Sequence, residues 1–169
     1  METTCLIRKM QTSDVKELSQ GFINQGWPGR EEILARYFLE QECGEREVLV
    51  AEVEGALVGY ITILPCAKQG PFAEIYPELS DFNVFEPFQN QGIGNLLLEE
   101  AEKRVRLTSD KVTLGVGLHS GYGPAQRLYI KRGYIPDGTG VWYQNHQPGM
   151  NAVCEDIGEL VLYLSKNLF

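Results

Sequence analysis

The sequence predicts one α+β domain over residues 1–169, with a mixed, mostly antiparallel sheet of about six to seven strands flanked by about four helices. Its 169 residues fit a single domain, because most domains hold about 100–200 residues. With 43% apolar and 22% charged residues, it has the composition of an ordinary globular protein. Segments of strand and helix periodicity follow in the order strand, two helices, three strands, helix, strand, helix and two strands.

The first strand and helix are expected before residue 25. Leu6–Met10 has the residue types of a short strand. Thr12 or Ser13 can cap a helix that reaches about Phe22, and Glu17 is placed to assist this cap.

A second helix and a hairpin are expected next. The segment 25–29 contains glycine and proline and should break the chain before a helix over 31–42, whose first turn carries glutamates. Strands at 47–53 and 57–64 flank Glu54-Gly55, a pair typical of a two-residue hairpin turn.

A loop at 65–77 precedes the strand at 78–85. At about thirteen residues, the loop is long enough to be functional. Because side chains alternate along a strand, Asp81 and Asn83 should share one face. The opposite face should carry Glu78, Ser80, Phe82 and Val84.

The C-terminal half should add two helices and three strands. Apolar residues recur at steps of four from Ile93 to Val105, which predicts a long amphipathic helix. Pro124 suits the first turn of a second helix, which runs to Lys131 and ends before Gly133. The last strands are expected at 112–116, 134–142 and 159–164, with a polar loop at 145–156.

The charge and the cysteines exclude several classes of protein. Fifteen basic and 23 acidic residues give a net charge of −8, which disfavours nucleic-acid binding and favours a cationic substrate. The four cysteines are far apart and form no zinc or redox motif, so no metal is expected. The best apolar run, Ala56–Leu64, is too short to span a bilayer, and no signal-peptide pattern opens the sequence. We therefore expect a cytoplasmic protein without a membrane partner.

A glycine-containing loop, Gln89–Gly94, follows the strand at 78–85 and leads into a helix. The first turn of a helix carries unpaired N–H groups and a partial positive charge. Glycine lets an anion approach this backbone closely, so the loop predicts a phosphate cradle. It lacks the Gly-Lys-Ser/Thr of a Walker loop and the Gly-x-Gly-x-x-Gly of a dinucleotide fold.

Two motifs resemble those of the GCN5-related N-acetyltransferase (GNAT) superfamily. Gln89-x-x-Gly92-x-Gly94 is similar to its Q/R-x-x-G-x-G/A signature, which binds the pyrophosphate of acetyl-CoA through backbone amides. The segment Ala125–Tyr134 resembles its A-x-x-L-Y-x-x-x-G-F/Y segment. The order of elements also matches over nearly the whole chain. The resemblance implies a GNAT-like fold and direct transfer of an acetyl group from acetyl-CoA to a primary amine, without a metal.

The resemblance also implies roles for individual residues. Tyr129 occupies the position of the family's general acid, and Glu78 lies at about the position of a glutamate that deprotonates the amine in some members. Asp81 is the second candidate for this base. The family often has asparagine where this chain has Tyr122. The residues expected to contact acetyl-CoA are Asn83, Val84, Gln89, Asn90, Gln91, Gly92, Ile93, Gly94, Tyr122, Ala125 and Tyr129.

The acceptor is expected to be a small, cationic amine. Trp27, Tyr76 and Glu78 are candidates to bind it, and Trp142 and Tyr143 could also line its pocket. Two alternatives remain open at this stage: a non-catalytic module that binds CoA, and an acetyltransferase that acts on protein lysines or N-termini. Exposed strand edges leave pairing into a homodimer open as well.

Overall fold

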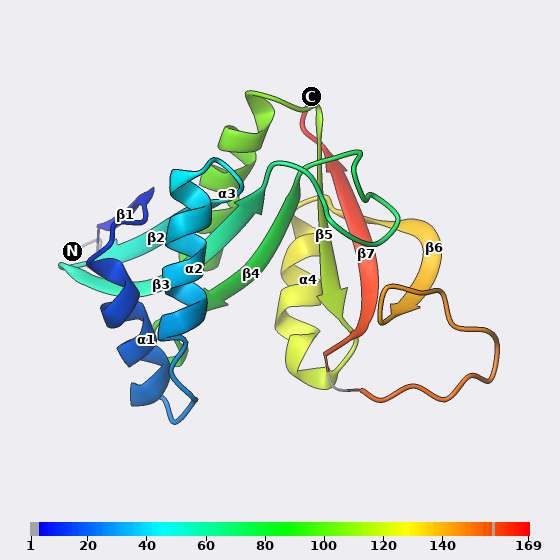
Figure 1. Cartoon of the computed structure of the whole chain (residues 1–169), viewed down its shortest axis with the longest axis horizontal. Coiled ribbons are helices and arrows are strands. Elements are labelled where there is room, and N and C mark those ends of the chain that lie inside the picture. The colour runs from blue at the N-terminus through cyan, green and yellow to red at the C-terminus, as the bar shows by residue number, and fades with distance from the viewer. Residues whose placement is uncertain (1–3, 157) are drawn as a thin grey trace. The chain divides into compact units, whose positions relative to one another are not determined.

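The computed structural model of the chain describes residues 4–156 and 158–169 and has the predicted order of helices and strands (Figure 1). The predicted domain, residues 1–169, includes positions 1–3 and 157, which lie outside the described residues. The chain divides into two compact units: Met1–Leu64 with Ser80–Arg104, and Pro65–Leu79 with Val105–Phe169.

The first unit holds three antiparallel strands and the helices beside them. Its elements are β1 (Cys5–Lys9), α1 (Asp14–Asn24), α2 (Glu31–Glu42), β2 (Glu47–Val53), β3 (Ala56–Leu64), most of β4 (Glu78–Val84), the 3₁₀ helix η1 (Glu86–Phe88) and most of α3 (Ile93–Arg106). Strand β2 pairs antiparallel with both β1 and β3. The predicted hairpin turn is confirmed, because Glu54 and Gly55 both have positive φ, 51° and 82°, as a type I′ turn requires.

The core of the first unit lies between these strands and helices α1 and α2. Leu18 and Leu34 of the two helices and Val48, Val50 and Tyr60 of the strands are fully buried in one cluster. Burial of a leucine or valine side chain is worth about 1.5–3 kcal/mol, so this cluster fixes both helices against the sheet.

The predicted cap of α1 needs a correction. Ser13 is the N-cap residue, but its side chain makes no capping hydrogen bond. Glu17 does not assist the cap either, because its Oε1 accepts a hydrogen bond from the Leu57 amide at 2.9 Å. Glu17 thus joins α1 to the start of β3.

The second unit combines three antiparallel strands with one helix. Its elements are the start of β4, β5 (Lys111–Gly117), the 3₁₀ helix η2 (Ser120–Tyr122), α4 (Gly123–Lys131), β6 (Ile135–Tyr143) and β7 (Leu160–Asn167). Strand β7 pairs antiparallel with β5 and β6, and it continues to Asn167 instead of ending at the predicted Leu164. Glu78 and Leu79 of β4 pair in parallel with β5.

The strand order among the described residues is β1-β2-β3-β4-β5-β7-β6, in one seven-stranded sheet. Strand β4 belongs to both units, because Glu78 and Leu79 lie in the second and the rest in the first. Strands β4 and β5 pair in parallel, whereas the pairs β1–β2, β2–β3, β5–β7 and β6–β7 are antiparallel. The predicted α+β class with a mixed, mostly antiparallel sheet is confirmed.

The long loop at 65–77 is held in place by backbone and side-chain contacts. It closes on itself through hydrogen bonds from the Ala67 amide to the Tyr76 carbonyl and from the Glu74 amide to the Ala67 carbonyl, both 2.8 Å. The Gly70 amide donates to Asn145 Oδ1 at 2.8 Å. A Cβ at Gly70 would lie 2.4 Å from the Tyr163 ring, so this ring packs directly on the loop backbone.

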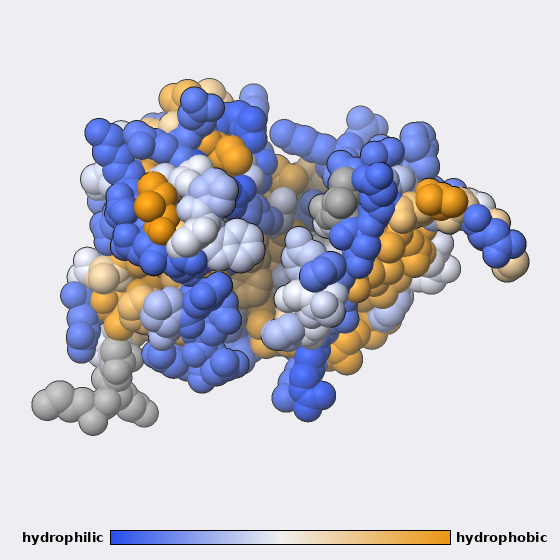
Figure 2. Space-filling model, turned by 90° about the horizontal axis from the view of Figure 1, so that it is seen from below, coloured by the Kyte–Doolittle hydropathy of each residue, from blue (hydrophilic) through white to orange (hydrophobic). Residues whose placement is uncertain are grey.

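On the face shown in Figure 2, polar and charged residues cover much of the surface, and apolar residues gather in patches between them. Among the exposed large hydrophobic residues are Trp27 and Leu39 in the first unit and Met150 and Val153 in the second. Over the described residues, we find no helix with the length and apolar character needed to cross a bilayer.

Candidate active site

Strand β4 contains one residue more than the stretch of β3 opposite it. The Phe85 amide donates to the Val58 carbonyl at 2.8 Å, and the Thr62 hydroxyl donates to the Ser80 carbonyl at 2.7 Å. Five steps along β4 separate these two contacts but only four along β3, and from this difference and the left-handed backbone of Asp81 we infer a β-bulge in β4. Asp81 lies within this bulge and has a φ of +48°.

Gly59 of β3 lies directly against the bulged strand. A Cβ at this position would be 2.5 Å from the Asn83 carbonyl oxygen and 3.1 Å from Val84 Cα. No larger residue fits there unless the backbone moves. Gly59 therefore allows the segment Asn83–Val84, predicted to bind acetyl-CoA, to lie this close to β3.

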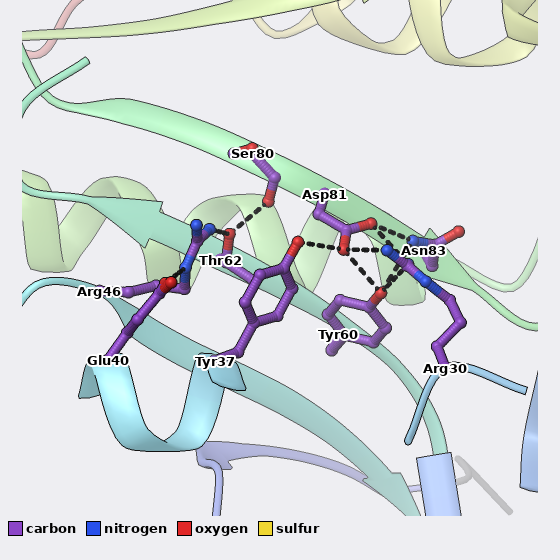
Figure 3. Close-up of polar contacts among 9 residues, drawn as sticks. All are labelled: Arg30, Tyr37, Glu40, Arg46, Tyr60, Thr62, Ser80, Asp81 and Asn83. Carbon is purple, nitrogen blue, oxygen red and sulfur yellow. Dashed lines mark hydrogen bonds and ion pairs between the residues drawn. The ribbon is translucent and has the colours of Figure 1, made fainter. Parts of the chain in front are cut away.

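A polar cluster surrounds the Asp81 carboxylate (Figure 3). Arg30 at the start of α2 forms an ion pair with it at 2.8 Å. The hydroxyls of Tyr37 on α2 and Tyr60 on β3 donate to Asp81 Oδ2 at 2.9 and 3.0 Å. Asn83 Nδ2 donates to Asp81 Oδ1 at 2.8 Å, which confirms that Asp81 and Asn83 share one face. We call these five residues the Asp81 cluster.

The two tyrosines of the Asp81 cluster remain hydrogen-bond donors at neutral pH. Burial raises the pKa of Tyr60 far above the usual value for a phenol, and the nearby negative charge of Asp81 raises it further. Burial and the same charge also raise the pKa of Tyr37. The Tyr60 hydroxyl, in addition, accepts a short hydrogen bond from Arg30 Nη1.

The Gln89–Gly94 loop leads from η1 into α3, as the sequence predicts. Gln89 Nε2 donates to the Val84 carbonyl at 2.9 Å and so ties the loop to the end of β4. Gly92 has a φ of +83°, and a Cβ built there meets no atom within 4 Å. Ile93 begins α3 and is only 4% exposed, so it anchors the loop in the core. The exposed backbone at Gly92, directly before a helix start, suits an anion such as pyrophosphate.

Trp27 lies on the connection between α1 and α2. Its indole Nε1 donates to Glu86 Oε1 at 3.4 Å, and the ring is 57% exposed. The Glu86 amide donates to Gln25 Oε1 at 3.0 Å. This connection is therefore joined to η1, which directly precedes the Gln89–Gly94 loop.

Tyr129 is the buried residue of α4, in the second unit. Its ring packs edge-on against Tyr134, with ring centroids 5.9 Å apart. Burial raises the pKa of the Tyr129 phenol well above its usual value, so the group is protonated at neutral pH. The helix buries Tyr129 more deeply than its neighbour Leu128, which is half-buried.

Tyr122 ends η2 and directly precedes α4. A Cβ at Gly117 would lie 2.5 Å from the Tyr122 ring, so the missing side chain of Gly117 makes room for this ring at the end of β5. Ala125 is half-buried in the first turn of α4. His119 accepts a hydrogen bond from the Gly121 amide at 2.9 Å, which gives it a local structural role.

Glu78 begins β4 in the second unit and is close enough to Tyr163 to affect its titration. Burial, and then the negative charge of Glu78, raise the pKa of Tyr163. Tyr76, two residues earlier, stacks under the Lys111 ammonium at 5.2 Å from the ring centroid. The Lys111 ammonium therefore already covers one face of the Tyr76 ring, which was predicted to bind the amine substrate.

The structure divides the predicted site residues between the two units. The first unit brings together Asp81 and Asn83, and it joins Val84 to the Gln89–Gly94 loop. The second unit contains Tyr76, Glu78, Tyr122, Ala125 and Tyr129. Within the described residues, no group of three or more His, Cys, Asp or Glu side chains is arranged to hold a metal ion.

Sequence reasoning missed four residues near the predicted contacts. They are Arg30, Tyr37, Tyr60 and Gly59. Asp81 is 51 residues from Arg30 and 44 from Tyr37 along the chain, so no local pattern connects them. The glycine inside an otherwise apolar strand is the signal that could have identified Gly59, because such a glycine often marks a close backbone approach.

Comparison with known proteins gives the family. The sequence model of the acetyltransferase (GNAT) family matches residues 13–134. No curated protein matches the sequence significantly.

Several solved structures share the fold. An N-acetyltransferase from Staphylococcus aureus Mu50 is 15% identical, with a TM-score of 0.72 over 99% of this chain and 100% of that chain. A ribosomal-protein-alanine N-acetyltransferase from Brucella melitensis is 24% identical, with a TM-score of 0.70 over 96% and 99%. The yncA protein of Salmonella typhimurium, solved with its cofactor acetyl-CoA, is 19% identical, with a TM-score of 0.67 over 98% and 94%.

The family match covers well over half of the sequence and includes both motifs, from the Gln89–Gly94 loop to Tyr134. The same loop has an open, left-handed glycine directly before a helix. The chain belongs to the GNAT family of acetyltransferases.

Proposed function

We propose that this chain transfers an acetyl group from acetyl-CoA to a primary amine of a small, cationic molecule. The observation that carries the proposal is the Gln89–Gly94 loop, in which the exposed Gly92 takes a φ of +83° just before α3. The family match and the acetyl-CoA in the yncA structure support the same cosubstrate.

The chain has groups that fit acetyl-CoA. Backbone amides of the Gln89–Gly94 loop would receive the pyrophosphate, because the start of α3 adds a partial positive charge. The backbone at Asn83 and Val84 would pair with the pantetheine amides and polarise the carbonyl. When bound, acetyl-CoA supplies the acetyl group as a thioester.

Glu78 is the proposed base that deprotonates the amine. An alkylamine is protonated at neutral pH, since its pKa is about 10.4, and must lose a proton before it can attack the thioester. Glu78 has the required chemistry and is half-buried at the start of β4. Asp81 is the alternative base in the first unit.

Tyr129 is the proposed acid that protonates the departing thiolate. Its raised pKa keeps the proton on the phenol until negative charge develops on sulfur. A thiol has a pKa of about 8.5, lower than that of the phenol, so alignment and the developing charge must drive this transfer.

The acceptor is proposed to be cationic because the chain carries a net charge of −8. Trp27, Tyr76 and Glu78 are the proposed acceptor contacts. Trp27 offers a largely exposed ring, and rings of this kind bind ammonium groups through cation–π contacts.

Release of CoA thiol from acetyl-CoA in the presence of an amine panel tests the proposal. The panel should hold polyamines, amino acids, aminoglycosides and a peptide with N-terminal alanine, because one neighbour acts on a ribosomal-protein alanine. We expect release to depend on a small amine, with the acetylated product identified by mass. Binding of acetyl-CoA without turnover on any amine would contradict catalysis, and preference for the peptide would contradict a small acceptor.

Glu78→Gln should remove the acidic limb of the pH profile for turnover. The amide cannot accept the proton of the amine, so the rate at neutral pH should fall by about 10²–10⁴-fold. Glu74→Gln is the matched control, because it removes the same charge from an exposed loop position in the same unit. A parental rate and pH profile in Glu78→Gln would exclude Glu78 as the base.

A further inference from the structure

We propose that Asp81 is a positioning residue that holds the bulge of β4 in the shape in which Asn83 and Val84 receive acetyl-CoA. The expected effect of this role on acetyl-CoA binding rests on the proposed function. It gives Asp81 a role other than that of the alternative base, and it assigns a role to residues that no motif covers.

The backbone of the bulge is left-handed at Asp81. Asp81 has a φ of +48°, in the left-handed region that disfavours side chains other than glycine. Such a conformation persists only where the surrounding structure holds it. If Asp81 relaxed into an extended conformation, the bulge would disappear and β4 would shift by one residue relative to β3. Such a shift would turn the side chains that follow Asp81 to the opposite face of the sheet.

Hydrogen-bond donors saturate the Asp81 carboxylate. Asp81 Oδ1 accepts from Arg30 Nη1 at 2.9 Å and from Asn83 Nδ2 at 2.8 Å. Asp81 Oδ2 accepts from the two tyrosine hydroxyls and pairs with Arg30 Nη2. An ionised carboxylate offers about four lone-pair sites, and these donors fill them. The arrangement suits a group that holds neighbouring segments in place more than one that must accept a proton from a substrate.

The donors to the Asp81 carboxylate are themselves fixed by the fold. The Arg30 amide donates to Ser19 Oγ on α1 at 3.0 Å. The Arg30 guanidinium lies over the Phe22 ring, 5.4 Å from its centroid. Tyr60 is fully buried in β3. The two helices and β3 thus determine where the Asp81 carboxylate lies.

A neighbouring set of contacts holds the other end of the bulge. The buried Thr62 hydroxyl donates to the Ser80 carbonyl and accepts from Arg46 Nη1, both at 2.7 Å (Figure 3). Arg46 pairs with Glu40 of α2 at 2.6 Å. Contacts that lead back to α2 therefore hold both Ser80 and Asp81.

The test compares Asp81→Ala with Asp81→Gly. Both variants remove the carboxylate, but only glycine accepts a φ of +48° without steric cost. We expect acetyl-CoA to bind Asp81→Gly more tightly than Asp81→Ala by about 5- to 30-fold, measured by calorimetry, because that is the range of the left-handed penalty. If Asp81 were instead a base, both variants would bind acetyl-CoA like the parent and would lose turnover equally.

A measurement without ligand separates this inference from the proposed function. Backbone NMR chemical shifts of Phe82, Asn83 and Val84 should move in both variants, because both lose the carboxylate, and should move further in Asp81→Ala than in Asp81→Gly. A parent that binds no acetyl-CoA would refute the proposed function, while these shifts would still decide whether Asp81 holds the bulge. Parental shifts in Asp81→Ala would overturn the inference.

Arg30→Gln provides a second test from the opposite side of the ion pair. It should weaken acetyl-CoA binding although Arg30 is not among the predicted contacts. Arg8→Gln is the matched control, because Arg8 is paired with Asp14 at 2.7 Å and its side chain has the same exposure, 24%, as that of Arg30. Arg8→Gln should lower the melting temperature and leave the affinity unchanged. Equal affinities in the two variants would contradict the positioning role.

Discussion

Tyr129→Phe should lower kcat by about 10²–10⁴-fold, the usual contribution of a positioned acid. The substitution keeps the ring that packs against Tyr134 and removes only the hydroxyl. The affinity for acetyl-CoA should change little, because the hydroxyl acts once charge develops on sulfur. The raised pKa of Tyr129 also predicts that the parent keeps its acid protonated as the pH rises through the usual range of a phenol.

Single-turnover kinetics and calorimetry on the same preparation would measure both effects. Tyr134→Phe is the matched control, because it removes the hydroxyl from the neighbouring, fully buried ring of the same aromatic pair. It should affect stability more than turnover. If Tyr129→Phe turns over at the parental rate while chemistry limits the rate, Tyr129 only packs, and Tyr122→Phe becomes the next variant to examine.

Gly92→Val should abolish measurable binding of acetyl-CoA. Gly92 has a φ of +83°, so a β-branched residue there must distort the Gln89–Gly94 loop. The distortion would move the amides at the start of α3, and the new side chain would block the approach of the pyrophosphate. Calorimetry with acetyl-CoA measures the effect directly.

Gly55→Val is the control for backbone strain in Gly92→Val. Gly55 has nearly the same φ, +82°, and a Cβ there also meets no atom within 4 Å, but it lies in the hairpin between β2 and β3. The free energy of unfolding should fall by a similar amount in both variants, and only Gly92→Val should fail to bind acetyl-CoA. A folded Gly92→Val variant with parental affinity would refute the phosphate cradle.

The sequence predicted the elements whose signals are local. The pair Glu54-Gly55 identified the hairpin because the turn itself requires two positive φ angles. Pro124 identified the start of α4, and the spacing of apolar residues identified α3. In each case, the residues that determine the structure are neighbours in the chain.

The features of the site that escaped prediction depend on contacts between distant segments. The positive φ of Asp81 is held by Arg30, which is 51 residues away, and nothing near Asp81 in the sequence indicates it. Alternation along β4 correctly placed Asp81 beside Asn83 but did not reveal the extra residue. The deeper burial of Tyr129 than of Leu128 likewise depends on packing that helical periodicity does not specify.

Gly59 shows a conflict between conformational stability and ligand recognition within one strand. Its neighbours Val58 and Tyr60 are fully buried, and a glycine between such residues destabilises a strand by about 0.5–1 kcal/mol relative to alanine. Replacing interior glycines is a common route to a more thermostable enzyme, and strand propensity alone would recommend it here. A methyl group at this position, however, would collide with the Asn83 carbonyl. Engineering for thermostability should therefore leave Gly59 unchanged, because a variant that tolerates heat better by rearranging β4 would lose the backbone surface proposed to bind acetyl-CoA.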